Sequence, residues 1–411
     1  MVSHMKNIQI RKIFLLILII VVSVHLFSCQ KTPKAEETDT TEEATTSDAK
    51  GEENPQYVTV DFTNRDSRLR QDYIVRSEVL HIVFIGNPNT FYSDFSIWVA
   101  ARVAPLYIEF QNFNYVSPKN AVALDASNVI LTQQVYLIAK GNCSIYGGTG
   151  SQGDNAANRA WHTGYDHPID GEDGEDGDAA PAAVVLNNGH ITVAENASFT
   201  IVGGNGGRGG NGGSGQGGSC EGIGQSGHGG CGANGGTGGT GLLINNAIRV
   251  ENNGTFAIIG GNGGIGGDGA RGGNNQDTGV FDRADHGGNG GHGGNGGNGG
   301  YAIQVLSTPD KVQVEGNLMI FVGGAGGAGG NGGDGGDSCK NEFQTSNGGN
   351  PGSAGNGGKG GNGAVAMQGL SVDADIQSGA GGIGGSKGEP GYNPNIGYGS
   401  PGTDGECGTK P

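Results

Sequence analysis

The chain has 411 residues, of which 88 are glycine, and its formal net charge is −17 at pH 7. Average glycine usage is about 7%, so this composition excludes an ordinary globular domain and indicates either disorder or a fold that needs missing side chains. The negative charge and the lack of a Lys/Arg cluster argue against a nucleic-acid partner, because phosphate backbones are bound by clustered basic residues.

The N-terminus has the layout of a secretion signal. Lys6, Arg11 and Lys12 precede the apolar run Ile13–Val22, which is followed by Leu26-Phe27-Ser28-Cys29. A membrane-spanning helix needs about 20 apolar residues, whereas a run of about 10 to 14 is typical of a signal core. The segment therefore favours a signal peptide over an uncleaved anchor helix, which is the alternative.

The last four residues of this segment resemble the bacterial lipobox, in which a small residue precedes a cysteine that is acylated and becomes the new N-terminus. The resemblance implies a signal peptide over residues 1–28 and acyl chains such as palmitate on Cys29. It also implies attachment to the membrane of a bacterial cell envelope, with the outer membrane or cell surface as the expected place. Residues 29–54 contain almost nothing that could be buried, so we expect an acylated, disordered tether.

Residues 55–146 are poorer in glycine and contain apolar, strand-like runs, among them 57–60, 80–85 and 106–110. These runs are similar to the early coils of right-handed β-helices in bacterial surface proteins with carbohydrate-binding modules. We expect this region to be the cap and the first coils of a solenoid, since solenoids need a cap to protect their first coil.

Beyond residue 146, a pair of short strands recurs and each time runs into a glycine tract. The tracts begin at residues 147, 203, 260, 323 and 379, so the intervals are 56, 57, 63 and 56 residues. A repeat of this length indicates stacked units that bury one another's apolar faces. We therefore predict an all-β fold: a right-handed parallel β-helix-like solenoid, with repeats of about 60 residues over 147–411.

The glycine tracts keep a strict three-residue phase, as in the four GGX triplets that begin at Gly203. Polyglycine II and polyproline II have three residues per turn and a rise of about 3.1 Å, so every third residue lies on one face. Two bare faces let neighbouring backbones approach closely, and the third residue points outward. We expect substitution of an inward glycine such as Gly294, or its neighbour Gly293, to be costly, and substitution of the outward Asn295 to matter little.

Each unit has an outgoing and a returning tract, so the inserted loops should form a bundle of ten polyglycine II helices. This arrangement resembles the glycine-rich adhesin tips of bacteriophage tail fibres and, more loosely, mycobacterial proteins with glycine-rich repeats. The resemblance covers residues 147–410 and depends on the triplet phase alone.

The cysteines suggest two cross-links in an oxidising, exported setting. Cys220 and Cys231 bracket one loop tip, and Cys339 and Cys407 occupy comparable places on two later loops. With Cys29 acylated, Cys143 would be left unpaired.

The sequence contains no nucleophile elbow, phosphate-binding loop, paired-cysteine zinc site or helical HExxH motif, so no catalytic residue, metal site or cofactor is predicted. Acidic triplets over 170–178 and a partial calcium nonapeptide at 332–337 are the nearest to ligand sets. Residues three apart on one arm are about 9 Å apart, so a solvated acidic face is favoured over a metal site.

The loop tips concentrate aromatic and basic residues that the arms exclude. Exposed aromatic and arginine residues on rigidly held loops are typical of recognition surfaces, although they could instead pack on each other to seal the bundle. The candidate ligand-binding residues are Trp161, Tyr165, Phe281, Arg283, Phe343, Tyr392 and Tyr398.

These features predict a non-enzymatic surface lipoprotein, held to the membrane through the lipid on Cys29. It would act as a rigid scaffold or adhesin for an external ligand, either a glycan or a surface protein. One alternative is a polysaccharide-active β-helix enzyme, which would need carboxylates and basic residues gathered on one strand face. The other is a structural surface coat without a specific ligand.

Overall fold

The computed structural model describes residues 56–65, 72–158, 169–219, 226–276, 286–307, 312–317, 319–338, 350–368, 375–394 and 396–411. The predicted signal peptide, Cys29 and the predicted tether lie outside these ranges. Within them the fold is all-β, and no helix there is long and apolar enough to cross a membrane.

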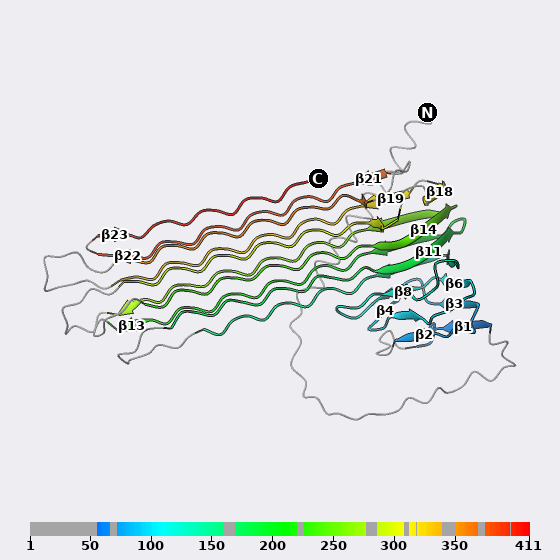
Figure 1. Cartoon of the computed structure of the whole chain (residues 1–411), viewed down its shortest axis with the longest axis horizontal. Coiled ribbons are helices and arrows are strands. Elements are labelled where there is room, and N and C mark those ends of the chain that lie inside the picture. Colours follow the sequence, from blue (N-terminus) through cyan, green and yellow to red (C-terminus); the bar gives the residue numbers. More distant parts are fainter. Residues whose placement is uncertain are drawn as a thin grey trace, which may run out of the picture. The chain divides into compact units, whose positions relative to one another are not determined.

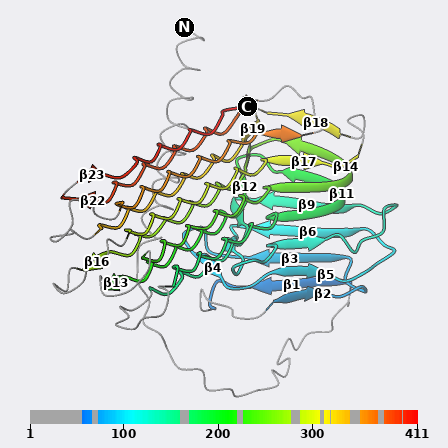
Figure 2. The ribbon, with the colours of Figure 1, turned by 60° about the vertical axis from the view of Figure 1, so that its left-hand side comes forward.

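The strands form a solenoid-like stack in which successive turns add one strand to each of three parallel ladders (Figures 1 and 2). The first two ladders belong to one 12-stranded sheet and are joined through the long strands β11 (Val184–Val193) and β14 (Leu242–Asn252). The first ladder contains the early residues of β11 and β14 with β2 (Tyr73–Val75), β5 (Ile97–Val99), β8 (Leu124–Ala126), β17 (Ile303–Val305) and β20 (Met367–Gln368). The second contains their later residues with β1 (Tyr57–Asp61), β3 (His81–Ile85), β6 (Leu106–Gln111), β9 (Val135–Lys140) and β18 (Val312–Gly316).

The third ladder is a separate seven-stranded sheet. It contains β4 (Phe91–Ser93), β7 (Asn114–Val116), β10 (Asn142–Tyr146), β12 (Ser198–Val202), β15 (Thr255–Ile259), β19 (Met319–Val322) and β21 (Asp375–Gln377). Residues that alternate along the strands of all three ladders point into one core. Aromatic rings continue through that core from turn to turn, with centroids 5.7 Å apart for Phe84 and Phe110, 6.2 Å for Phe110 and Phe199, and 5.7 Å for Phe199 and Phe256.

The paired asparagines of the repeat form the corner between the first two ladders. At Asn187 the register of β11 shifts, which bends the strand. Asn245 donates from Nδ2 to Asn187 Oδ1 over 2.7 Å, and Asn246 donates to Asn188 in the same way. These amides link one turn to the next at a bend where the backbone ladder is interrupted.

Five pairs of arms leave the stack after β10, β12, β15, β19 and β21 and return to it, except that the last ends at the C-terminus (Figure 1). The outgoing arms are 147–158, 203–217, 260–274, 323–338 and 379–391, and the returning arms are 169–183, 226–241, 286–301, 350–364 and 399–410. Outgoing arms lie in one layer and returning arms in another. At the far end, β13 (Gly218–Ser219) pairs with β16 (Asn275–Gln276), and β22 (Tyr392–Asn393) pairs antiparallel with β23 (Gly397–Tyr398).

Backbone hydrogen bonds follow the triplet phase. The first glycine of a triplet donates to the third residue of the next arm in its own layer, as Gly206 does to the Asn262 carbonyl over 2.8 Å. The second glycine donates to the other layer, as Gly264 does to the Gly236 carbonyl over 2.7 Å. Both glycines therefore face neighbouring backbone.

Glycine is kept only where a neighbouring arm stands. A Cβ on Gly293 would lie 2.1 Å from the Gly330 carbonyl oxygen, and one on Gly294 would lie 1.9 Å from that of Ala233. The first outgoing arm and the first returning arm have no preceding arm in their own layer. After Gly148, the second positions of their triplets carry Ser151, Asp154, Ala157, Glu172, Glu175 and Asp178. The last arm has no successor, and its first positions carry Pro401, Asp404, Cys407 and Lys410. The acidic triplets thus mark the beginning of the bundle.

Candidate binding surfaces

Most of the predicted tip residues fall outside the described chain. These are Trp161, Tyr165, Phe281, Arg283 and Phe343, together with the cysteines Cys29, Cys220 and Cys339. Tyr392 and Tyr398 are described, and the structure brings them together.

Tyr392 and Tyr398 form one exposed pair at the far end of the last two arms. They are register partners in the β22–β23 hairpin, their ring centroids are 5.0 Å apart, and 44% and 74% of their surfaces are exposed. The fully buried Asn393 holds the hairpin, because its Nδ2 donates to Ser338 Oγ over 2.6 Å and its Oδ1 accepts the Ile396 N–H. The hairpin thus presents two aromatic rings on a fixed support.

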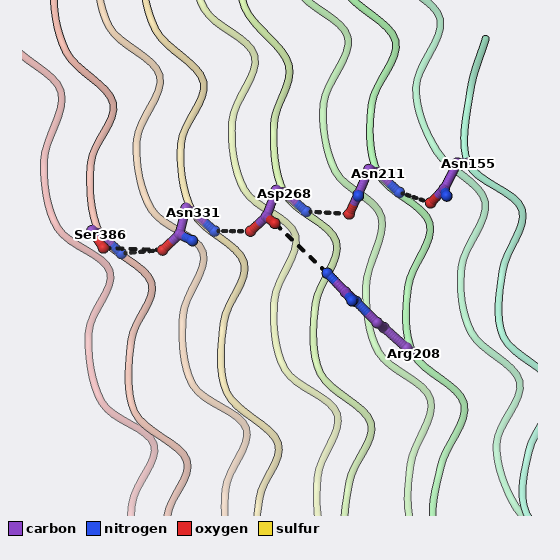
Figure 3. A network of polar contacts seen from close by, with 6 residues as sticks. All are labelled: Asn155, Arg208, Asn211, Asp268, Asn331 and Ser386. Carbon is purple, nitrogen blue, oxygen red and sulfur yellow. Dashed lines mark hydrogen bonds and ion pairs between the residues drawn. The ribbon is translucent and has the colours of Figure 1, made fainter. Parts of the chain in front are cut away.

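The outer face of the outgoing layer carries rows of linked side chains (Figure 3). In one row, the backbone N–H of Asn211 donates to Asn155 Oδ1 over 2.8 Å, that of Asp268 to Asn211, that of Asn331 to Asp268, and that of Ser386 to Asn331. Each third residue thereby supplies the acceptor for the third residue of the next arm. Asn and Asp recur at this position because a short side chain with an oxygen can reach that N–H.

The returning layer has matching rows, in which histidine can replace asparagine. His228, His286 and His292 each accept a backbone N–H at Nδ1, from Asn289, Asn350 and Asn356 respectively, over 2.7 to 3.0 Å. An imidazole can accept there only in its neutral form. These histidines therefore join neighbouring arms by hydrogen bonds, as the asparagines do.

The rows correct the expectation for Asn295. Its Oδ1 accepts the Lys359 N–H over 2.9 Å, and its own N–H donates to Asn234 Oδ1 over 3.0 Å. The side chain points outward, as predicted. Through its Oδ1 and its backbone N–H, however, Asn295 is hydrogen-bonded to the arms on both sides of its own.

The acidic triplets take part in the same rows. Asp170, Asp173 and Asp176 accept the N–H groups of the next returning arm over 2.6 to 2.7 Å. Asp334 and Asp337, in the partial nonapeptide, accept the N–H groups of Glu389 and Tyr392. Among the described residues, no three His, Cys, Asp or Glu side chains gather as a metal site, and a structural role accounts for these carboxylates.

Three cysteines are described: Cys143 is buried in the core, Cys231 is half-buried and Cys407 is exposed. Burial raises the pKa of the Cys143 thiol, although backbone hydrogen bonds lower it in part. The proposed partners of Cys231 and Cys407 lie outside the described residues, so both disulfides stay predictions.

A second exposed surface, which the sequence analysis missed, lies on the outer side of the second ladder. Tyr57, His81, Tyr107, Tyr136 and His190 occupy the same register position on five successive strands and form what we call the ring column. Successive centroids are 4.7, 5.9, 4.4 and 5.1 Å apart. Arg249 occupies the next position along the column.

Charged groups flank the ring column two residues further along the strands. Glu109 is buried, with Oε1 2.8 Å from Lys140 Nζ and Oε2 3.7 Å from His81 Nε2. Burial alone would raise the pKa of Glu109, but hydrogen bonds from Lys140 and Gln111 hold it below its ordinary value. A second group repeats the pattern, with Glu251 2.8 Å from Arg249 and 3.4 Å from His190.

The nearest signal in the sequence was the recurrence of Tyr or His near the start of successive strand-like runs, as in Leu80-His81, Leu106-Tyr107 and Val135-Tyr136. Its meaning depends on register between strands that are tens of residues apart, which strand patterns alone do not fix.

No family model and no curated protein sequence matches this chain. Among solved structures, it is similar to the springtail antifreeze protein from Granisotoma rainieri, described as a bundle of nine polyproline type II helices. The match has 25% identity, covers 43% of this chain and 92% of that chain, and has a TM-score of 0.13. At that TM-score the likeness carries no argument for fold or function.

Proposed function

We propose that this chain is a surface lipoprotein, anchored through acyl chains on Cys29 in the bacterial cell envelope, that acts as a rigid scaffold and binds an external ligand. The lipobox, the composition of residues 29–54 and the repeats support this proposal. The ligand would be a glycan or a surface protein rather than a nucleic acid, given the net charge of −17.

We further propose that the stack is a right-handed parallel β-helix and that the arms are polyglycine II helices. The parallel ladders and the three-residue phase of the hydrogen bonds support this finer description. Such arms are stiff because both glycines of nearly every inner triplet are bonded to neighbours.

The observation that carries the proposed function is the exposed pair Tyr392 and Tyr398 on a hairpin fixed by Asn393. Arms of about 12 residues at about 3.1 Å per residue place this pair some 35 to 40 Å beyond the stack. Rigid aromatic side chains bind with little loss of conformational freedom, so the pair is suited to contact with an external partner.

The enzyme alternative is weaker. Glu109 on β6 and Glu251 on β14 are separated by β9 and β11, so three strand spacings of about 4.8 Å place their Cα atoms about 14 Å apart. Paired carboxylates of glycoside hydrolases are at most about 9.5 Å apart. Each of these carboxylates also forms an ion pair, Glu109 with Lys140 and Glu251 with Arg249.

The test is adhesion of the mature chain to glycan and surface-protein arrays, with Tyr392→Ala/Tyr398→Ala beside the wild type. We expect saturable binding that the double variant weakens at least tenfold while its Tm stays within about 2 °C, since exposed side chains away from special features contribute little to stability. Absence of saturable binding would favour a surface coat instead. An unmodified Cys29 in membrane-extracted protein would refute the lipid anchor.

A further inference from the structure

The ring column is a continuous, partly exposed feature of the stack, far from the tip hairpin in the chain. Its five rings span four strand steps, or about 19 Å at about 4.8 Å per step. The strands that carry it lie side by side in Figure 2. Tyr57 and Tyr107 remain 51% and 38% exposed.

The rings hold one another in place. Tyr107 and Tyr136 stack with centroids 4.4 Å apart and planes 10° apart, whereas His81 meets Tyr57 nearly edge-on at 72°. Aromatic pairs of this kind add about 0.5–1.5 kcal/mol beyond their area. The rings are therefore ordered before any ligand arrives, which lowers the entropy lost on binding.

The flanking groups supply hydrogen-bonding capacity beside the middle of the column and at one end of it. Glu109 and Lys140 lie on β6 and β9, the strands of Tyr107 and Tyr136, and Arg249 and Glu251 lie on β14, beyond His190. The side chain of Lys140 is 52% exposed and that of Arg249 is 42% exposed. Each of the two carboxylates is thus paired with a partly exposed cation next to the aromatic rings.

We propose that the ring column and its two flanking charged groups bind a linear oligosaccharide lying along the stack axis. A sugar chain presents C–H groups that pack on the exposed edges of rings whose faces lie against one another, as those of Tyr107 and Tyr136 do. Its hydroxyls pair with carboxylates, ammonium and guanidinium groups. A nucleic acid is disfavoured because Glu109, Glu251 and Glu315 follow the column on its flank. A folded protein partner is disfavoured because the aromatic surface is one side chain wide, and stable protein interfaces bury about 1,200–2,000 Å².

This inference rests on the proposed function, since it names a ligand class and a second binding surface for the same scaffold. It predicts that binding of a linear oligosaccharide at the ring column survives loss of the tip pair, whereas binding of the external partner of the tip does not. The two proposals can therefore fail separately.

The experiment is titration of the mature chain, by calorimetry, with linear hexasaccharides of cello-, xylo-, manno- and oligogalacturonate type. We expect Tyr107→Ala/Tyr136→Ala to weaken binding of the preferred sugar at least tenfold and Arg249→Gln to weaken it several-fold. Arg249→Gln leaves all five rings of the column in place, so it reports on binding even if the double variant unfolds.

The matched control is Phe91→Ala. Phe91 is 52% exposed and pairs with Tyr146 at 5.7 Å, but it lies on the third ladder, away from the ring column. The Phe91→Ala variant should bind the preferred hexasaccharide as the wild type does, and so should Tyr392→Ala/Tyr398→Ala. Failure of every hexasaccharide to bind, or equal binding by Arg249→Gln and the wild type, would overturn the proposal. Loss of sugar binding only in the Tyr392 and Tyr398 variant would move the glycan site to the tip.

Discussion

Gly294→Ala tests the packed bundle most directly. The added Cβ would lie 1.9 Å from the Ala233 carbonyl oxygen, against a practical limit of 3.0 Å, so arms 226–241 and 286–301 must separate by about 1 Å. That movement lengthens the bonds from Gly232 N–H to His292 O and from Gly235 N–H to Asn295 O, both 2.8 Å. Two weakened hydrogen bonds at about 1 kcal/mol each, with overpacking of about 1–3 kcal/mol, give a loss of about 3–5 kcal/mol.

The measurements are thermal unfolding by circular dichroism and amide hydrogen exchange resolved along the arms. We expect Tm to fall by on the order of 5–15 °C and the two named arms to exchange faster, since a local opening can precede global unfolding. Gly293→Ala should behave similarly, because its Cβ would meet Gly330. Glu175→Ala is the control, as it occupies the same triplet position as Gly294 on an arm with no predecessor. Equal, small effects of Gly294→Ala and Glu175→Ala would refute close packing of the arms.

Three further predictions concern single side chains. Asn295→Val should cost about 0.5–1 kcal/mol in urea unfolding, because the Lys359 N–H loses its acceptor, whereas Asn295→Asp should cost less; equal costs would contradict the role of Oδ1. The lowered pKa of Glu109 means that its stabilisation is present above about pH 4.5 and is lost as the pH falls through the lower folded-state value, so Glu109→Gln should flatten the dependence of stability on pH below pH 4.5. Cys143, whose thiol pKa is raised by burial, should resist iodoacetamide in the native protein and react in denaturant; rapid native labelling of Cys143 would argue against the core position.

The triplet phase was enough to predict the arms, because two adjacent glycines in every turn of three are needed only when backbone faces backbone. The alternation of apolar and polar residues likewise predicted stacked parallel strands. Both patterns are local in the sequence and can be recognised within a few residues, although the contacts that require them join segments far apart in the chain.

The side-chain rows were not predictable in the same way. Asn211 forms hydrogen bonds with Asn155 and Asp268 only because the register of the strands before their arms places these three triplets side by side. The interpretation of the acidic triplets as a solvated face also missed their cause, which is the absence of an arm before them. The ring column depends on the register between five strands from β1 to β11.

The unequal ends of the bundle make a final prediction about whole repeats. The inner positions of both arms in residues 203–259 carry glycine, except for Ala233 and, at the far ends of the arms, Gln216 and Ser226. A tandem copy inserted after Ile259 should therefore add two arms and one turn of the stack without loss of stability, as expected for a quasi-one-dimensional fold. A tandem copy of residues 147–202 inserted after Val202 should fail, because its Ser151, Asp154 and Glu175 equivalents would face a preceding arm. At that position in inner arms a Cβ lies only 1.7 to 1.9 Å from a carbonyl oxygen, as at Gly207 and Gly210. Thermal unfolding and hydrogen exchange of the two insertions would separate them, and equal stability of both would show that arm spacing adapts to side chains and that glycine is not required by packing.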